Sequence, residues 1–352
     1  MVAKISLLQD YCDQYGMTIN EEKTKFFVIN GSNEDSNPIR VNGLLVRHCE
    51  HYIYLGSPFT SDGSISSSVR VHANKKMPHV LKFVSFMKKN NDIPFVVKRR
   101  VFEAALLSAI IYGCESWLNA DLKPIVKLYN WALKQLLSVR RSTCNDVCYI
   151  ESGYPPIEKL IKQRQRKFFR NMIRERRHYD DDPLMFAVNK ILNSNTHTSR
   201  YIKELIDNDV DDVRVAMTDL KQRLLLNNSS RRVVYKEINP DLNVHYVYSG
   251  NHSINEMHRV AFTQFRVSGH SLAIETGRWN RRGRGRLPVE ERLCRCGGIQ
   301  DEKHVITHCV HTQHIRNMYG FNTINELFSD RYEPDTMCKI IYDILRTYVN
   351  DR

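Results

Sequence analysis

The tightest constraint on the fold is a group of thiols and an imidazole near the C-terminus, where Cys294, Cys296, His304 and Cys309 fall within 16 residues. Zinc prefers thiolate and imidazole ligands, and a structural zinc site is a closed tetrahedron of four of them. A Cys-x-Cys pair followed by a His and a Cys therefore predicts a zinc site. We expect a structural ion, because four protein ligands leave no coordination position for water.

The spacing of the last two ligands restricts the local structure. His304 and Cys309 are five residues apart, so both reach one ion only if the helix expected there is short or irregular. His308 is the alternative fourth ligand, and His311 and His314 crowd the same segment. The competing interpretation is a surface turn that carries Cys and His without a metal.

The other six cysteines are scattered, and the polar N-terminus MVAKISLLQDYCDQ does not fit a signal peptide. Free thiols in a reducing compartment follow from this pattern. No apolar run approaches the roughly 20 residues that a membrane helix needs, which argues against a spanning protein. We expect an intracellular protein, nuclear or cytoplasmic, with the nucleus favoured.

The positive charge of the 352-residue chain, formally +13, is concentrated in three blocks around 70–100, 159–177 and 278–295. Such blocks favour an anionic partner, with RNA or DNA first and a membrane surface second. The alternative is a set of solvated helix faces or, for the last block, a flexible basic linker. The expected nucleic-acid contacts are Lys75, Lys76, Lys88, Lys89, Lys98, Arg99, Arg100, Arg164, Arg166, Lys167, Arg170, Arg278, Trp279, Arg281, Arg282, Arg284 and Arg286.

The first 60 residues mix one helix with short strands. Residues 4–15 carry an amphipathic pattern, and Thr24–Ile29 is rich in aromatic and β-branched residues. Asn42-Gly43 between IRV and LLV is the strongest hairpin signal in the chain. The segment HYIYLG predicts a further strand that Gly56 closes.

Beyond residue 62 the pattern is helical. We expect helices over 66–90, 97–112, 122–139 and 156–177, with short helices in 181–250. The fold class is α+β and predominantly α-helical. The expected segments are a sheet-bearing part (1–62), a helical bundle with a basic connector helix (63–178), a mixed helical linker (179–255) and the Arg-rich segment with the zinc site and a final helix (256–352).

Two acidic strings resemble catalytic motifs. Tyr179-Asp180-Asp181-Asp182 matches the aromatic-x-Asp-Asp of polymerases, but it follows RERRH and precedes Pro183, with no strand on either side. Glu333-Pro334-Asp335 with Lys339 faintly resembles a nuclease site, but residues 336–348 predict a helix. We expect a catalytic role for neither, and no P-loop, dinucleotide fingerprint, nucleophile elbow or HExxH is present.

An ordered set of motifs resembles the C-terminal part of reverse transcriptases from non-LTR (LINE-type) retrotransposons. The matching strings are GMTINEEKTKFFVI, HYIYLG, IYGCESW, ESGYPPIEKLIKQRQRKFFRNMI and SLAIETGRWN followed by EERLCRCG-x7-H-x4-C. They follow the family's order and cover most of the chain. The resemblance implies the end of a palm, a thumb, a basic connector helix and a CCHC zinc knuckle.

The resemblance also assigns residues. Tyr54, Leu55 and Gly56 correspond to the primer grip, and Lys23 or Lys25 corresponds to a lysine proposed to protonate the leaving pyrophosphate. In the family the fingers and the metal-binding aspartates precede this segment, so we expect a truncated, catalytically inactive fragment without bound catalytic Mg²⁺. The two lysines then serve as solubilising groups on a strand edge. The palm strands would expose an edge that a partner polypeptide covers.

The leading hypothesis is therefore a reverse transcriptase fragment that binds RNA or DNA without polymerising. A domesticated zinc-knuckle protein acting as a nucleic-acid-binding module or adaptor is the first alternative. Residual reverse transcriptase or endonuclease activity is the second.

Overall fold

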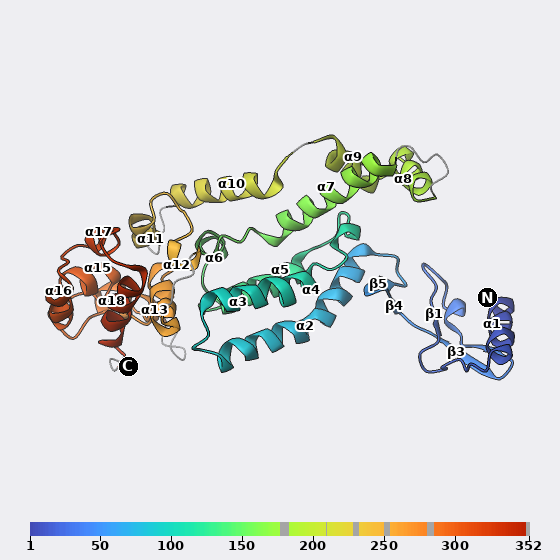
Figure 1. Cartoon of the computed structure of the whole chain (residues 1–352), viewed down its shortest axis with the longest axis horizontal. Coiled ribbons are helices and arrows are strands. Elements are labelled where there is room, and N and C mark those ends of the chain that lie inside the picture. Colours follow the sequence, from blue (N-terminus) through green and yellow to red (C-terminus); the bar gives the residue numbers. More distant parts are fainter. Residues whose placement is uncertain (177–182, 209, 228–231, 250–253, 280–284, 350–352) are drawn as a thin grey trace. The chain divides into compact units, whose positions relative to one another are not determined.

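The computed structural model describes residues 1–176, 183–208, 210–227, 232–249, 254–279 and 285–349, and most of them lie in helices (Figure 1). Short strands occur only in the first 60 of these described residues. The predicted α+β, predominantly α-helical class is confirmed. No helix of the described part combines the length and apolar character needed to cross a bilayer.

The chain folds into two compact units. Unit 1 contains residues 1–77, 110–125 and 164–209, and unit 2 contains 78–109, 126–163 and 210–352. The units interleave along the sequence, whereas the four segments expected from the sequence follow one another.

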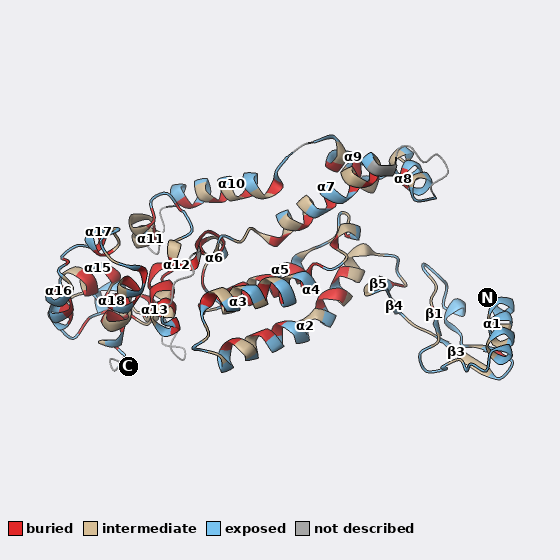
Figure 2. Ribbon diagram, in the orientation of Figure 1, coloured by how far each residue is buried: buried red, intermediate tan, exposed pale blue. Residues whose placement is uncertain are grey.

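Unit 1 begins with helix α1 (Val2–Gln14), which buries none of its residues (Figure 2). Strands β1 (Lys25–Phe26), β2 (Ile39–Val41) and β3 (Leu44–His48) form a sheet of order β1-β3-β2. The predicted Asn42-Gly43 hairpin joins β2 to β3, with φ of 45° and 85° at the two turn residues. These angles belong to a type I′ turn, which suits the right-handed twist of the flanking strands. Strand β1 is shorter than the predicted 24–29.

A second hairpin pairs β4 (His51–Tyr54) with β5 (Ser57–Thr60) through Leu55 and Gly56. Their φ angles are 48° and 88°, so Leu55 adopts a left-handed conformation that side chains rarely take. The Tyr112 hydroxyl donates a hydrogen bond of 2.8 Å to the Leu55 carbonyl, which helps to hold the turn. Strand β4 was predicted, whereas β5 was not, because Pro58 interrupts the strand pattern.

The helices of unit 1 bury a small core of Phe169, Met172, Val188, Ile202 and Leu205. Its members come from α7 (Ile157–Arg176), α8 (Pro183–Asn193) and α9 (His197–Asp207). The predicted helix over 156–177 is confirmed as α7, and the short helices expected after residue 181 are also present.

Three other predicted helices are present, but their bounds or regularity differ from the prediction. Helix α2 (Ile65–Lys89) matches 66–90 and contains Pro78. Helix α5 (Lys123–Leu136) matches the first part of 122–139. The segment predicted as one helix over 97–112 is instead α3 (Phe95–Val101), a π-helix η2 (Phe102–Leu107) and α4 (Ser108–Ile110). A π-turn inserts extra residues into the helix and rotates the side chains that follow it.

Unit 2 is built from short helices. Helix α13 (Glu256–Arg266) packs along α18 (Pro334–Arg346). The remaining α-helices are α6 (Asn145–Ser152), α10 (Asp212–Leu226), α11 (Val233–Ile238), α12 (Tyr246–Ser249), α14 (Ala273–Thr276), α15 (Glu302–Thr307), α16 (Gln313–Tyr319) and α17 (Ile324–Leu327).

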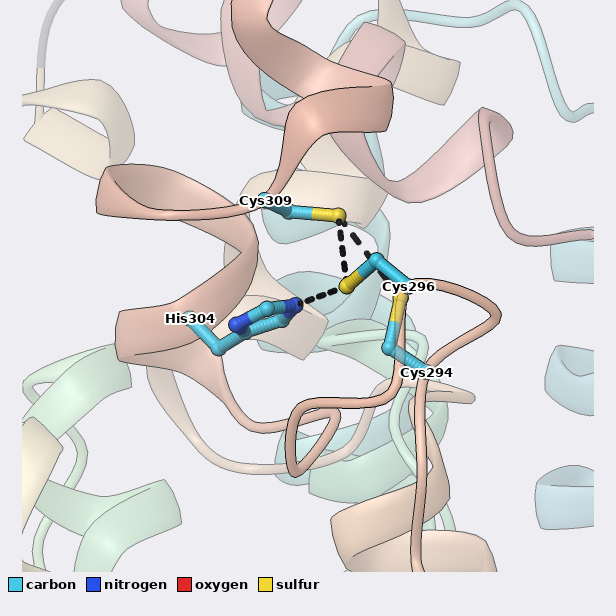
Figure 3. A group of neighbouring side chains, drawn as sticks. All are labelled: Cys294, Cys296, His304 and Cys309. Atoms are coloured by element: carbon cyan, nitrogen blue, oxygen red, sulfur yellow. Dashed lines mark hydrogen bonds between the residues drawn. The ribbon is translucent and has the colours of Figure 1, made fainter.

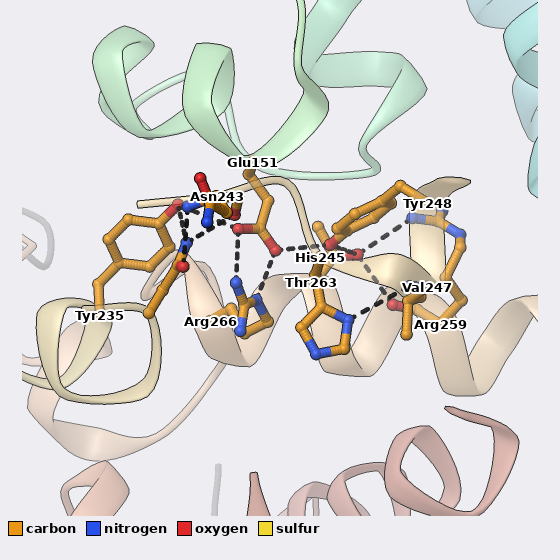
Figure 4. Close-up of polar contacts among 10 residues, drawn as sticks. Glu151, Tyr235, Asn243, His245, Val247, Tyr248, Arg259, Thr263 and Arg266 are labelled. Carbon is orange, nitrogen blue, oxygen red and sulfur yellow. Dashed lines mark hydrogen bonds and ion pairs between the residues drawn. The ribbon is translucent and has the colours of Figure 1, made fainter. Parts of the chain in front are cut away.

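A buried ion pair joins helices of unit 2. Arg266 donates two hydrogen bonds to the Glu151 carboxylate, of 2.6 and 3.1 Å, and neither side chain is more than 1% exposed. The hydroxyls of Tyr235 and Tyr248 donate to the same carboxylate at 3.0 and 2.8 Å (Figure 4). Glu151 thus links α6 to α11, α12 and α13.

The network continues along α13. Tyr248 shares a 2.8 Å hydrogen bond with Thr263, and Arg259 donates to Thr263 at 3.1 Å. Arg259 also pairs with Glu256 through two hydrogen bonds of 2.7 Å. Buried charges are tolerated where partners satisfy them, and here the carboxylates of Glu151 and Glu256 pair with Arg266 and Arg259, although Arg266 Nη1 is buried without a hydrogen-bond partner among the described residues.

Replacing Glu151 with alanine should strongly destabilise the protein. The change leaves the Arg266 charge buried without its carboxylate, and breaking such a pair costs about 3–5 kcal/mol. Urea unfolding of the full chain measures the loss. Lys303 forms an ion pair of 2.8 Å with Glu237 and is 50% exposed, so the matched control Lys303→Ala should cost under about 1 kcal/mol. Equal losses in both variants would show that the buried network does not support the fold.

Candidate metal centre and basic surfaces

A tight turn presents the first two candidate ligands. The Gly298 carbonyl accepts a 2.7 Å hydrogen bond from the Cys294 N–H, and the Cys294 carbonyl accepts one of 2.9 Å from Gly297. Gly297 has φ +90°, which favours glycine. A Cβ on Gly298 would lie 2.8 Å from the His304 ring, so only glycine lets that ring approach the turn.

The third and fourth ligands lie on either side of a helix end. The Asp301 side chain caps α15 by accepting a 2.8 Å hydrogen bond from the His304 N–H. Helix α15 ends at Thr307, and Cys309 then adopts an extended conformation that begins the 3₁₀-helix η6 (Val310–Thr312). The short helix predicted from the His304–Cys309 spacing is confirmed.

The four side chains converge (Figure 3). The Cys309 Sγ lies 3.6 Å from the Cys294 Sγ and 3.7 Å from the Cys296 Sγ, and the Cys296 Sγ lies 3.1 Å from the His304 Nε2. All four ligand atoms lie within 4.8 Å of one another. Sulfur ligands of a tetrahedral zinc ion are about 3.8 Å apart. The cluster therefore has the composition and spacing to hold a metal ion such as zinc.

His308, the alternative ligand, lies outside the cluster. It is exposed, and its Nδ1 shares a hydrogen bond with the Thr307 hydroxyl. The structure thus brings Cys309 rather than His308 to the other three ligands.

The pKa shifts of Cys296 and His304 favour the protonation states that bind a metal ion. A hydrogen bond from the Gly298 backbone lowers the pKa of Cys296, and burial lowers the pKa of His304, which favours the neutral imidazole. Burial instead raises the pKa of Cys294 to about 11. A bound cation would favour the thiolate form at that buried position.

Two further residues surround Cys309. Arg316 is buried and donates a 2.7 Å hydrogen bond to the Cys309 carbonyl and a 2.9 Å bond to the Thr312 hydroxyl. Tyr348 is 4% exposed, and its hydroxyl forms no hydrogen bond within the described part of the chain. Burial first, and the adjacent Cys309 second, raise the pKa of Tyr348. Nothing in the local sequence connects Arg316 or Tyr348 to the ligands, so both were missed.

Two of the predicted nucleic-acid contacts are wrong. Lys98 is 2% exposed and forms an ion pair of 2.9 Å with the equally buried Glu256. Arg166 is 5% exposed and donates to the carbonyls of Leu205 and Asn208 at the end of α9. Carboxylate or carbonyl oxygens satisfy both charges there, so their burial is tolerated.

The other basic candidates in the described residues are at least partly accessible. Exposed side chains are those of Lys75, Lys88, Lys89, Arg100, Arg164, Lys167 and Arg286, and those of Lys76, Arg99 and Arg170 are half-buried. Arg99 is engaged with Glu103 at 3.1 Å. Arg281, Arg282 and Arg284 lie outside the described residues, as does Tyr179–Asp182.

The residues assigned by resemblance in unit 1 are also at the surface. Tyr54 is 60% and Leu55 76% exposed. Lys23 and Lys25 are exposed. The primer-grip-like segment is thus a hairpin tip whose apolar side chains face outward.

The faint nuclease string lies on a helix start. Glu333 occupies the N-cap position of α18 without a side-chain capping hydrogen bond. Asp335 lies in the first turn, where its Oδ1 accepts a 3.4 Å hydrogen bond from the Asn255 N–H. Lys339 is exposed on the same helix. The helix predicted over 336–348 is present.

The Arg-rich segment that precedes the metal ligands in the chain takes part in a cation–π contact. The Arg140 guanidinium lies 4.0 Å from the centre of the Trp279 ring, and Trp279 is 41% exposed. Arg278 pairs with Glu275 at 2.9 Å. Arg140 was missed by the sequence prediction, although the Arg140-Arg141 doublet between two helices was a visible signal.

Comparison with known proteins gives no relative: no family model, curated protein or solved structure matches the chain.

Replacing Cys309 with serine should abolish tight metal binding. The purified wild type should carry about one metal ion per chain by elemental analysis, and the variant less than about 0.3, because one of four ligands is lost. A chelator should lower the melting temperature of the wild type only. The matched control Cys12→Ser, which alters a half-buried thiol outside the cluster, should keep the ion. A metal-free wild type with a melting temperature indifferent to chelator would contradict the site.

Proposed function

We propose that the chain binds RNA or DNA as the thumb-to-knuckle part of a non-LTR retrotransposon reverse transcriptase, with no polymerase chemistry of its own. One observation carries this proposal. In unit 2 the Cys₃His cluster is preceded in the chain by Trp279, and the Arg140 guanidinium stacks on the Trp279 ring. Zinc modules and stacked aromatic and arginine side chains are both common in nucleic-acid recognition.

We propose zinc as the ion of the Cys₃His cluster and assign it a structural role. Three thiolates and one imidazole form a closed site, which selects zinc over harder cations. The ion would tie the Cys294–Gly298 turn to α15 and so hold the segment that carries Trp279. Nucleic acid would contact residues around the centre rather than the metal.

Exposed cations would supply the affinity. Lys88 and Lys89 end α2, Arg100 lies on α3, and Arg286 precedes the metal ligands. These side chains would contact phosphates and neutralise charge, which releases counterions and makes affinity fall with salt. Phosphate contacts would position the strand without reading its sequence.

The double variant Lys88→Ala/Lys89→Ala should weaken binding and its salt dependence. Fluorescence anisotropy with a labelled duplex from about 0.05 M salt upward gives the slope of log affinity against log salt. Each lost phosphate contact should reduce that slope by about 0.9. Lys303→Ala is the control, because Lys303 is already paired with Glu237. Absence of binding at the lowest salt, or affinity without a salt slope, would overturn the proposed function.

A second candidate, an adaptor that binds a polypeptide, has support in unit 1. Leu7, Leu8 and Tyr11 are at least 50% exposed on α1, and Phe59 is 46% exposed on β5. Exposed apolar side chains at this density indicate an interaction surface or an aggregation liability. A partner polypeptide would cover them, as expected for a palm remnant.

Residues 1–60 expressed alone should be poorly soluble. The short strands leave edges and apolar side chains open to water, and both promote association. Size-exclusion chromatography and thermal melting of this fragment provide the measurement. Monodisperse material that melts cooperatively would argue against a missing partner.

A further inference from the structure

A cavity lies beside the metal centre, entirely within unit 2. Its volume is about 670 Å³, within the range of small-ligand sites. Arg140 and Trp279 line one part of it, and Leu293, next to the ligand Cys294, lines another. Tyr348 also lines it and lies beside Cys309, so the cavity and the metal cluster share a wall.

The cavity offers a flat aromatic surface with a cation on it. The Arg140 guanidinium lies 4.0 Å from the centre of the Trp279 ring, and the indole remains 41% exposed. Aromatic rings such as the indole, and arginine guanidinium planes, are surfaces on which unpaired bases stack in proteins. A tryptophan with no ligand role would more often be buried.

The remaining residues that line the cavity are polar and charged as well as apolar. Such a lining suits a site that contacts the edge of a nucleobase as well as its flat face. Ser271, Thr276 and Gln300 contribute hydroxyl and amide groups, and Glu291 contributes a carboxylate. The Gln300 Oε1 accepts a 2.7 Å hydrogen bond from the Ala273 N–H, which orients its amide. A carboxylate accepts hydrogen bonds from the exocyclic amino group of a base.

We propose that this cavity receives a single unpaired nucleobase of a bound strand, stacked against Trp279 and Arg140. The inference rests on the proposed nucleic-acid binding and adds the substrate class: a single-stranded or flipped-out nucleotide rather than a paired one. A duplex keeps its bases stacked inside, so it contacts only the surrounding cations. The cavity therefore discriminates single strands from duplexes.

The experiment compares two neighbouring arginines in the full chain. Arg140 lines the cavity, whereas Arg141 stacks 4.4 Å from the centre of the Trp131 ring and does not line it. Each of Arg140→Ala and Arg141→Ala removes one positive charge from the same loop. Affinity for a labelled single strand of about 12 nucleotides, within the site sizes of single-strand binding modules, and for a duplex of the same length is measured at one salt concentration. Trp279→Ala and Trp279→Phe complete the set.

Arg140→Ala and Trp279→Ala should weaken single-strand binding about tenfold more than duplex binding, the loss expected for one stacked base. Arg141→Ala should weaken both equally, and Trp279→Phe should keep most of the single-strand affinity. Melting temperature and metal content should stay at wild-type values in every variant, which excludes a folding defect.

The outcomes separate the two proposals. If the wild type binds both strands with a salt slope but Arg140→Ala and Trp279→Ala lose no more single-strand affinity than Arg141→Ala, the base site is wrong and the proposed function stands. If the wild type binds neither strand, the proposed function fails and the base site fails with it.

Discussion

The Glu151–Arg266 ion pair is the interaction on which unit 2 depends. Glu151 and Arg266 are 115 residues apart in the sequence and fully buried, so the pair forms only when α6 and α13 pack together. Two tyrosine hydroxyls complete the hydrogen bonds of the carboxylate and bring α11 and α12 to the same point. A buried charge that is left unpaired costs several kcal/mol, so the network penalises other arrangements of these helices.

The Cys₃His cluster acts on a smaller scale in the same unit. It connects the Cys294–Gly298 turn to the end of α15. Because α15 ends at Thr307, Cys309 can reach the other three ligands. A bound metal ion would cross-link the Cys294–Gly298 turn to α15. The cavity shares a wall with this cluster. Loss of a bound metal would therefore disturb the Trp279 surface, which would couple the proposed ion to the proposed recognition of a base.

Local signals predicted the features that a few neighbouring residues decide. Asn42-Gly43 predicted its hairpin because two consecutive positive φ angles suit these residues. The spacing of Cys294, Cys296, His304 and Cys309 predicted the cluster because ligand chemistry is specific. The π-helix η2 was not predicted, since the apolar pattern of 97–112 fits an α-helix equally well. Strand β5 was missed because its Pro58 is tolerated only on a strand edge.

By itself, the sequence determined the fold class, the Asn42-Gly43 hairpin, the main helices and the four metal-ligand candidates. Hydrophobic period, turn chemistry and ligand type act over short distances along the chain, so they are visible in the sequence. Only the tertiary structure decided which charges face the solvent. Lys98 and Arg166 belong to basic runs just as Lys89 and Lys167 do. Lys98 is nevertheless buried against Glu256, and Arg166 is buried against the carbonyls at the end of α9. It also joined Arg140 to Trp279, which lie far apart in the sequence. Such pairings depend on which distant segments pack together, and no local pattern records that.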